Sequence, residues 1–131
     1  MGQTHEEGLQ EILEIAFAVP GNFYVGLCSD NTILKGDEYT DLVEVIGSGY
    51  GLIALSTAVV SVYNTDDRKI TFNEVTFSAT GTWTEAVQWF IVSDGDTSGT
   101  YKLLFSNALS AAVTLTNGES QAVTPVVNAN G

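Results

Sequence analysis

Residues 70–106, ITFNEVTFSATGTWTEAVQWFIVSDGDTSGTYKLLFS, decide the fold class. Apolar residues at 70, 72, 75 and 77 alternate with polar ones, and the Asn73-Glu74 pair shifts the alternation by one residue. This pattern predicts a strand with one buried face and a bulge. The apolar run VQWFIV at 87–92 predicts a more deeply buried strand, and a third begins at 101–105 after a stretch of turn-forming residues.

The chain outside this block shows the same pattern of short strands separated by turns. We expect strands at 23–28 and 42–46, one long or two short strands within 50–62, and a closing hairpin of 112–116 with 120–127 around the turn Asn117-Gly118. About eight short strands at regular spacing are typical of an antiparallel sandwich or barrel. The sequence therefore predicts an all-β domain.

A single helix is predicted near the N-terminus, from Thr4 to Ala18. Thr4 and Glu7 fit a capping box, and Pro20-Gly21 ends the segment. Its apolar face contains Leu9, Ile12 and Leu13 at helical spacing. Such a face packs on its own domain or docks as an arm on a neighbouring subunit. We accordingly divide the chain into a helix or arm at 1–20 and a β-sandwich domain at 21–131.

Composition excludes several classes of function. The 131 residues include 16 acidic and only 4 basic side chains, for a net charge of −12. Binding to nucleic acid or to an anionic membrane needs the opposite sign, so neither is expected as a partner. No run approaches the roughly 20 apolar residues of a membrane span, and the glutamates near the start argue against a secretion signal. An acidic surface that resists aggregation is the simplest interpretation.

Candidate catalytic and metal-binding residues are sparse. Cys28 is the single cysteine and is expected to be a small buried residue, while the single histidine, His5, lies in the predicted helix. The acidic residues near predicted turns are expected to be turn formers, and they are Asp37, Glu38, Asp41, Glu44, Asp94 and Asp96. The run Asp94-Gly95-Asp96 resembles the opening of a calcium loop but lacks the remaining ligand pattern. We therefore expect no enzyme, no cofactor and no catalytic or metal-ligating residue, although a loop-bound Ca²⁺ stays open.

The two tryptophans are candidates for recognition. Trp89 falls inside a predicted buried strand, so core packing is expected. Trp83 lies in the loop TGTWTEA, residues 80–86, where it is either tucked over the end of the core or offered to a partner. Sugar-binding domains use exposed tryptophans on β-sandwiches, so a lectin-like alternative would depend on Trp83.

Five segments in order carry a resemblance to a known family. They are FYVGLCSD (23–30), EVIGSGYGLIAL (44–55), ITFNEVTFSATGTWTEAVQWFIVSD (70–94), GTYKLLFSNAL (99–109) and NGESQAV (117–123). In this order the chain resembles a family of small bacteriophage virion proteins, over roughly residues 9–126. Members are often labelled tail-fibre proteins, and similar proteins form trimeric jelly-roll cement on capsids. The chain departs from the family in the segment GSGYG (47–51), which lacks the arginine-like residue usual after the tyrosine, and at Trp89-Phe90, which replaces a histidine–tryptophan pair.

The resemblance implies an all-β, jelly-roll-like antiparallel β-sandwich with one short N-terminal helix. It implies a capsid cement or decoration protein on the virion exterior, with the major capsid protein and further copies of itself, as a homotrimer, for partners. Leu9, Ile12, Leu13 and Trp83 are the candidate assembly-interface residues. The alternatives are a tail-fibre or baseplate component with receptor or glycan contact, and a free carbohydrate-binding module.

Overall fold

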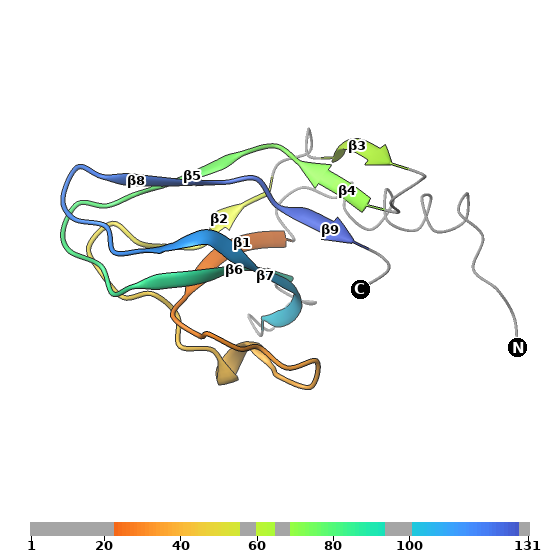
Figure 1. The fold of residues 1–131 in the computed structure, drawn as a ribbon, viewed down its shortest axis with the longest axis horizontal. Coiled ribbons are helices and arrows are strands. Elements are labelled where there is room, and N and C mark those ends of the chain that lie inside the picture. Colours follow the sequence, from red (N-terminus) through yellow and green to blue (C-terminus); the bar gives the residue numbers. More distant parts are fainter. Residues whose placement is uncertain (1–22, 56–59, 65–68, 94–100, 129–131) are drawn as a thin grey trace, which may run out of the picture.

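The structure is a computed structural model that describes residues 23–55, 60–64, 69–93 and 101–128, and these residues form an antiparallel β-sandwich (Figure 1). The elements in chain order are β1 (Phe23–Cys28), η1 (Tyr39–Asp41), β2 (Ile53–Ala54), β3 (Val60–Asn64), β4 (Lys69–Phe72), β5 (Val75–Ser78), β6 (Ala86–Ser93), β7 (Lys102–Val113), β8 (Ser120–Val123) and β9 (Val126–Asn128). The all-β prediction is confirmed. The predicted helix at 4–18 lies outside the described residues.

One sheet has the strand order β2-β1-β6-β7. Its centre is the antiparallel pair β1 and β6, in which Phe23 faces Ser93 and Cys28 faces Gln88. The predicted buried strand at 87–92 is β6, and it lies between β1 and β7. A strand in this position has no free edge, which suits its nearly continuous apolar sequence.

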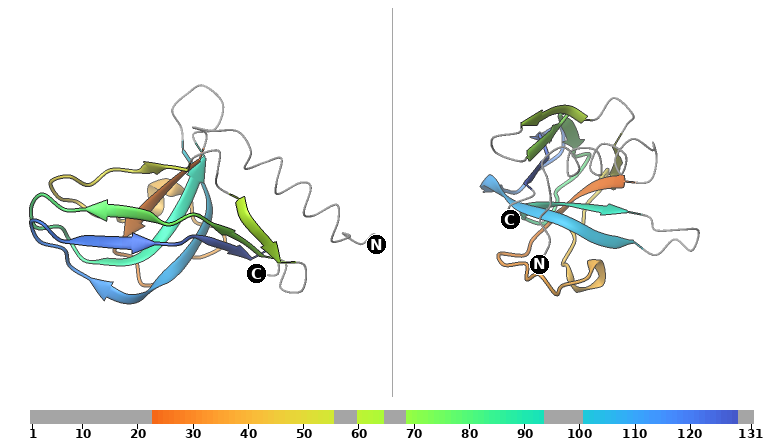
Figure 2. Two further views of the ribbon diagram at one scale, coloured as in Figure 1. Left: turned by 90° about the horizontal axis from the view of Figure 1, so that it is seen from above. Right: turned by 90° about the vertical axis from the view of Figure 1, so that its right-hand side faces the viewer.

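The second sheet is formed by β3, β4 and β9 and continues into the pair β5 and β8. Thr71 faces Val126 whereas Val75 faces Val123, so the segment 71–75 has one residue more than the segment 123–126 opposite it. The Phe72 N–H still donates to the carbonyl oxygen of Pro125 at 2.9 Å. The predicted one-residue shift at Asn73-Glu74 is therefore a bulge, and β4 and β5 follow each other along β9 and β8 (Figure 2).

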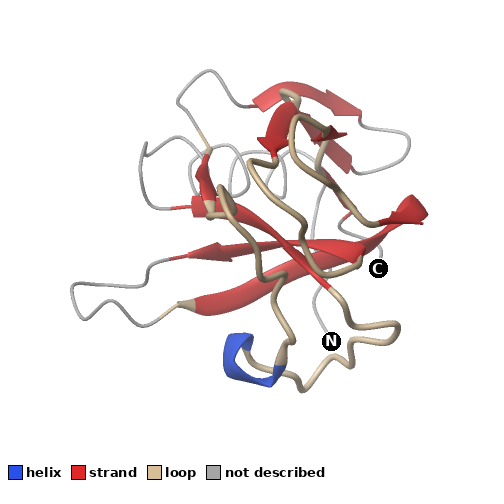
Figure 3. Cartoon of the chain, turned by 90° about the vertical axis from the view of Figure 1, so that its left-hand side faces the viewer, coloured by secondary structure: helices blue, strands red, loops and turns tan. Residues whose placement is uncertain are grey.

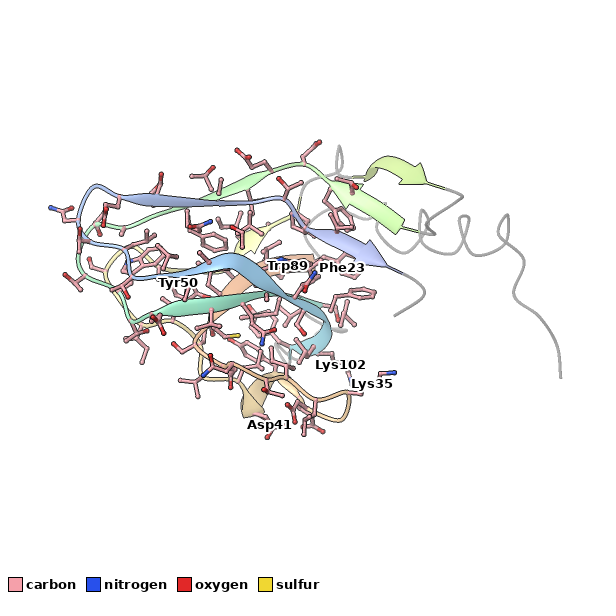
Figure 4. All side chains as sticks on the ribbon, in the orientation of Figure 1. Phe23, Lys35, Asp41, Tyr50, Trp89 and Lys102 are labelled. Atoms are coloured by element: carbon pink, nitrogen blue, oxygen red, sulfur yellow. The ribbon has the colours of Figure 1, made fainter. Side chains whose placement is uncertain are left out.

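The main core lies between the two sheets. Val25, Leu27, Trp89 and Ile91 of the first sheet pack in one cluster with the buried side chains of the second sheet, which are Phe72, Phe77 and Val123. The core position expected for Trp89 is confirmed, and Figure 4 draws its side chain in the layer between the sheets. Each fully buried aromatic or aliphatic side chain of this kind contributes about 1.5–3 kcal/mol through loss of water contact.

A third layer covers the other face of the first sheet. Cys28, Phe90 and Val92 point to this face, and side chains of the segment 29–52 pack on them, namely Ile33, Tyr39, Leu42 and Leu52. Figure 3 shows η1, which lies in the middle of this segment, below the strands. Because β6 is covered on both faces, four consecutive residues from Trp89 to Val92 are buried, and alternation disappears from its sequence.

The predicted closing hairpin is wrong. Strand β7 runs on to Val113, and the returning chain pairs elsewhere, β8 with β5 and β9 with β4. The turn itself is formed at Asn117-Gly118, where Gly118 has a φ of 89° and the Glu119 N–H donates to the Thr116 carbonyl. This turn lies between β7 of the first sheet and β8 of the second. The sequence therefore predicted the turn correctly, but it did not predict the strand with which the following segment pairs. The stretch 50–62 contains parts of two strands, β2 and β3.

Candidate assembly interface

Trp83 lies inside the end of the sandwich. Its side chain is 2% exposed, and its indole N–H donates to the Ser48 carbonyl oxygen at 2.7 Å. The ring of Tyr50 meets it edge-on, with ring centroids 5.4 Å apart and planes at 85°. The tucked position is therefore the one observed, and the indole has no open face on which a sugar ring would stack.

The turn 47–50 packs directly against this indole. A Cβ built on Gly47 would lie 2.1 Å from Cδ1 of Trp83, so the backbone needs glycine there to approach the ring. Gly49 has a φ of +87°, and the Ser48 and Thr80 hydroxyls lie 2.9 Å apart beside it. The sequence signal GSG thus marks the contact between this turn and the Trp83 loop.

Two exposed apolar side chains lie in the segment between η1 and the turn 47–50, and one of them, Ile46, contacts the Trp83 loop. Val43 is 60% exposed and Ile46 is 72% exposed, and both line a shallow hollow of about 600 Å³. Ile46 is tied to the loop because its carbonyl accepts the Thr84 N–H at 2.9 Å and its own N–H donates to Thr84 Oγ1 at 3.0 Å. We call Val43 and Ile46 the apolar pair. Water-exposed apolar residues held this firmly are typical of contact surfaces when they are clustered.

The apolar pair is held in place by Glu44, whose side chain turns inward. Its two carboxylate oxygens accept the hydroxyl protons of Tyr39 and Tyr50, each at 2.5 Å. The Tyr50 hydroxyl also accepts the Leu27 N–H at 3.0 Å, and Glu44 makes an antiparallel bridge with Cys28 on β1. Hydrogen bonds to a charged group stabilise more than neutral ones, so this cluster fixes the backbone between Val43 and Ile46.

The tyrosines of this cluster are held in the neutral form. Burial raises the pKa of Tyr50, and the hydrogen bond to Glu44 raises it further. Burial and the same carboxylate also raise the pKa of Tyr39. A tyrosine of this kind is poorly suited to act as a base or nucleophile near neutral pH, so the cluster serves as a structural tie.

Cys28 is fully buried next to this cluster. Burial raises the pKa of its thiol to about 12, with the nearby charges of Asp30 and Glu44 acting in the same direction. The thiolate is the reactive form of cysteine, so the thiol is inert in the folded protein. The expectation of a small buried residue at position 28 is confirmed.

Alkaline pH is expected to destabilise the fold. The pKa values of Cys28, Tyr39 and Tyr50 are higher in the folded than in the unfolded protein. Their contribution to the free energy of unfolding is therefore complete below the unfolded-state pKa values and is lost as the pH rises from about 9. The free energy of unfolding, measured by urea titration between pH 7 and 11, should fall by up to about 1.4 kcal/mol per pH unit for each group. The Cys28→Ala variant should show a shallower fall near pH 9–10. An equally stable protein at pH 8 and 11 would contradict this assignment.

The other predicted site residues divide into three groups. The prediction that Glu44 is a turn former is wrong, because its carboxylate binds the hydroxyl groups of Tyr39 and Tyr50. Asp37 accepts the Leu34 N–H at 2.8 Å and Asp41 accepts the Glu38 N–H at 2.8 Å, so both are turn formers as expected. Asp94, Asp96, Leu9, Ile12 and Leu13 lie outside the described residues, as does His5. The apolar pair was not predicted. The strand predicted at 42–46 is also wrong, because this segment forms only an isolated bridge, between Glu44 and Cys28.

Comparison with known proteins adds no relative. No family model, no curated protein and no solved structure matches the chain. Within the described ranges, no group of three or more histidine, cysteine or acidic side chains is arranged to hold a metal ion. In the same ranges no helix has the length and apolar character needed to span a membrane.

Proposed function

We propose that the protein is a structural component of a bacteriophage virion, a cement protein that stabilises the capsid by bridging major capsid subunits. The observation that carries the proposal is the apolar pair, Val43 and Ile46, exposed on a backbone that Glu44 and Thr84 hold rigidly. It is the kind of pre-formed apolar surface that a partner covers at little ordering cost. The resemblance of five ordered segments to small virion proteins supports the same role.

The mechanism is thermodynamic. Packaged DNA pushes outward on a capsid, and a protein that binds only the assembled lattice stabilises that lattice by mass action. Many copies add their separate contacts into a large total, as linked binding sites do. The net charge of −12 disfavours non-specific aggregation of the unbound protein, and the apolar pair supplies the contact with the capsid.

The test is a binding assay with purified protein and empty capsids, together with a reconstruction of the intact virion. Ile46→Asp should lower capsid binding by about 10-fold or more while leaving the melting temperature unchanged, because the side chain is exposed in the free protein. Thr76→Asp is the matched control, since Thr76 is exposed on β5 in the other sheet. An equal loss of capsid binding in both variants would mean that the added negative charge weakens binding and that Ile46 is not part of the interface.

The reconstruction separates the alternatives. Density repeated over the joints between major capsid subunits is the expected result. Density confined to the tail would replace the cement role with a tail-fibre or baseplate role, and absence from the particle would refute both. A glycan site based on the Trp83 indole is not supported, because that ring is buried.

A further inference from the structure

The turn between β7 and β8 contains a chemically reactive pair of residues. Asn117 and Gly118 are both exposed in this turn, which lies at the left end of the sandwich in Figure 1. The side-chain amide of an asparagine can react with the main-chain nitrogen of the next residue. Glycine in that place favours the reaction because it has no side chain to hinder the approach. A Cβ built on Gly118 would meet no heavy atom within 4 Å, so the space around the pair is open.

The reaction needs no reagent other than water and its hydroxide ion. Hydroxide removes the proton of the Gly118 N–H, and the nitrogen attacks Cγ of Asn117. The new N–Cγ bond closes a five-membered succinimide ring, and the Cγ–Nδ2 bond breaks as the side-chain nitrogen takes up a proton and leaves as ammonia. Water then opens the ring. Cleavage of the bond from nitrogen to Cγ gives aspartate, whereas cleavage of the bond from nitrogen to the main-chain carbonyl carbon gives isoaspartate.

In the folded protein the attacking nitrogen is engaged in a hydrogen bond. The Gly118 N–H donates to the carbonyl oxygen of Ala79 at 2.9 Å, and the Ala79 N–H donates to the carbonyl oxygen of Glu119 at 2.9 Å. Ala79 follows directly on β5 and is buried, so these two bonds extend the pairing of β5 with β8 to the turn. A hydrogen-bonded N–H loses its proton only when the bond opens, as in amide hydrogen exchange.

The turn is closed by the side chain of Glu119. Its Oε1 atom accepts the N–H and the hydroxyl proton of Thr116, each at 2.7 Å, and the Glu119 N–H donates to the Thr116 carbonyl oxygen at 3.0 Å. The hydroxyl and the N–H of Thr116 lower the pKa of Glu119, so the carboxylate is ionised at neutral pH. Gly118 is the third residue of this turn and has a φ of +89°, which favours glycine. These contacts together hold the Gly118 N–H against Ala79.

We propose that Asn117 is a site of spontaneous deamidation, and that the hydrogen bond from Gly118 to Ala79, held in place by Glu119, sets its rate. The fold thus slows a reaction that the local sequence favours. Conversion to aspartate adds one negative charge to the turn. Conversion to isoaspartate also inserts one main-chain atom before Gly118, and the hydrogen bonds to Ala79 cannot form with both residues unless the turn shifts. The proposal is independent of the proposed function.

The test follows deamidation of the full-length protein at pH 8 by peptide mapping and mass spectrometry, with chromatographic separation of the two products. A synthetic peptide of residues 112–122 gives the rate without the fold. Asn117 in the folded protein should convert about 10-fold more slowly than in the peptide, because the hydrogen bonds have to open first. Glu119→Ala should raise the rate in the folded protein by about 3-fold or more and leave the rate in the peptide unchanged.

Controls and a second readout use the same protein. Thr114→Ala, at an exposed position before the turn, should leave the rate at Asn117 unchanged. The second Asn-Gly pair of the sequence, Asn130-Gly131, lies outside the described residues, and its rate is read in the same digest. Hydrogen exchange of the Gly118 amide, measured by NMR, should accelerate in Glu119→Ala by the same factor as deamidation.

Four results would overturn the proposal. They are equal rates in the folded protein and the peptide, no conversion of folded wild type and Glu119→Ala while the peptide converts, an equal acceleration of both Asn-Gly pairs by Glu119→Ala, and a Gly118 N–H that exchanges as freely as in the peptide. The first and the last would mean that the hydrogen bond to Ala79 does not protect the nitrogen. The second would mean that the turn cannot reach the reactive geometry, and the third that Glu119 acts on the whole fold.

Discussion

Replacing Trp83 with alanine is expected to lower the free energy of unfolding by about 3–5 kcal/mol, a large share of the 5–15 kcal/mol typical of a domain. The side chain is almost completely buried, it meets the ring of Tyr50, and it holds the turn at Ser48 through its N–H. Its removal leaves a large cavity at the end of the core and takes one of two donors from the Ser48 carbonyl, which keeps the Thr80 N–H at 3.0 Å. Urea unfolding followed by circular dichroism measures the change.

Trp83→Phe separates packing from hydrogen bonding. Phenylalanine fills most of the volume but lacks the donor, so the expected cost is about 1–2 kcal/mol for one lost hydrogen bond and the lost contacts, since the Ser48 carbonyl still accepts the Thr80 N–H. Thr82→Ala is the control in the same loop, because Thr82 is exposed and a change within about 0.5 kcal/mol is expected there. A Trp83→Ala protein as stable as the control would contradict the tucked position.

Gly47→Ala is expected to cost about 3 kcal/mol, the upper end of the range for overpacking. The added methyl group would lie 2.1 Å from Cδ1 and 2.8 Å from Cα of Trp83, and the second of these atoms belongs to the backbone. A rotamer change of the indole therefore does not relieve the overlap completely. The measurement is again the free energy of unfolding.

Gly47→Ala has two controls, which are the same substitution at another glycine and a double mutant with Trp83→Ala. Gly36→Ala meets no heavy atom within 4 Å, so a change near zero or a small stabilisation is expected. Combining Gly47→Ala with Trp83→Ala removes the ring atoms that the methyl group meets. The double mutant should therefore lose less free energy of unfolding than the sum of the losses in the two single mutants. Strict additivity would mean that the two residues do not touch.

The strands of residues 70–106 were predictable because their signals are local. Alternation, the one-residue shift at Asn73-Glu74 and the apolar run ending at Val92 each follow from the burial of a strand by its neighbours. The pairing of β8 with β5 was not predictable, because a turn such as Asn117-Gly118 reverses the chain without specifying its next partner. Strand β7 also has a bulge at Leu104, between the residues that face Ile91 and Val92, which was missed because it depends on the register with β6.

The candidate site was predicted only in part. The loop around Trp83 was recognised from the sequence, but its contact with the turn at 47–49 depends on the fold. The exposure of Val43 and Ile46 was missed, because an apolar residue in a strand pattern is normally buried. The segment 29–41 belongs to no element predicted from the sequence, and Ile33 and Tyr39 within it cover Phe90 and Val92. Coverage of this kind is decided by distant chain segments.

The order in which strands pair also determines how the protein reaches this structure. Strand β1 pairs with β6, and β4 and β5 pair with β9 and β8, so these partners are separated by about 40 to 60 residues of the chain. Such non-local pairing makes folding slow, in the range of milliseconds to seconds, since loop closure precedes any gain from contacts. During synthesis the second sheet has to wait for residues 120–128. A nascent chain halted before them would present β5 unpaired, with its buried face open to aggregation.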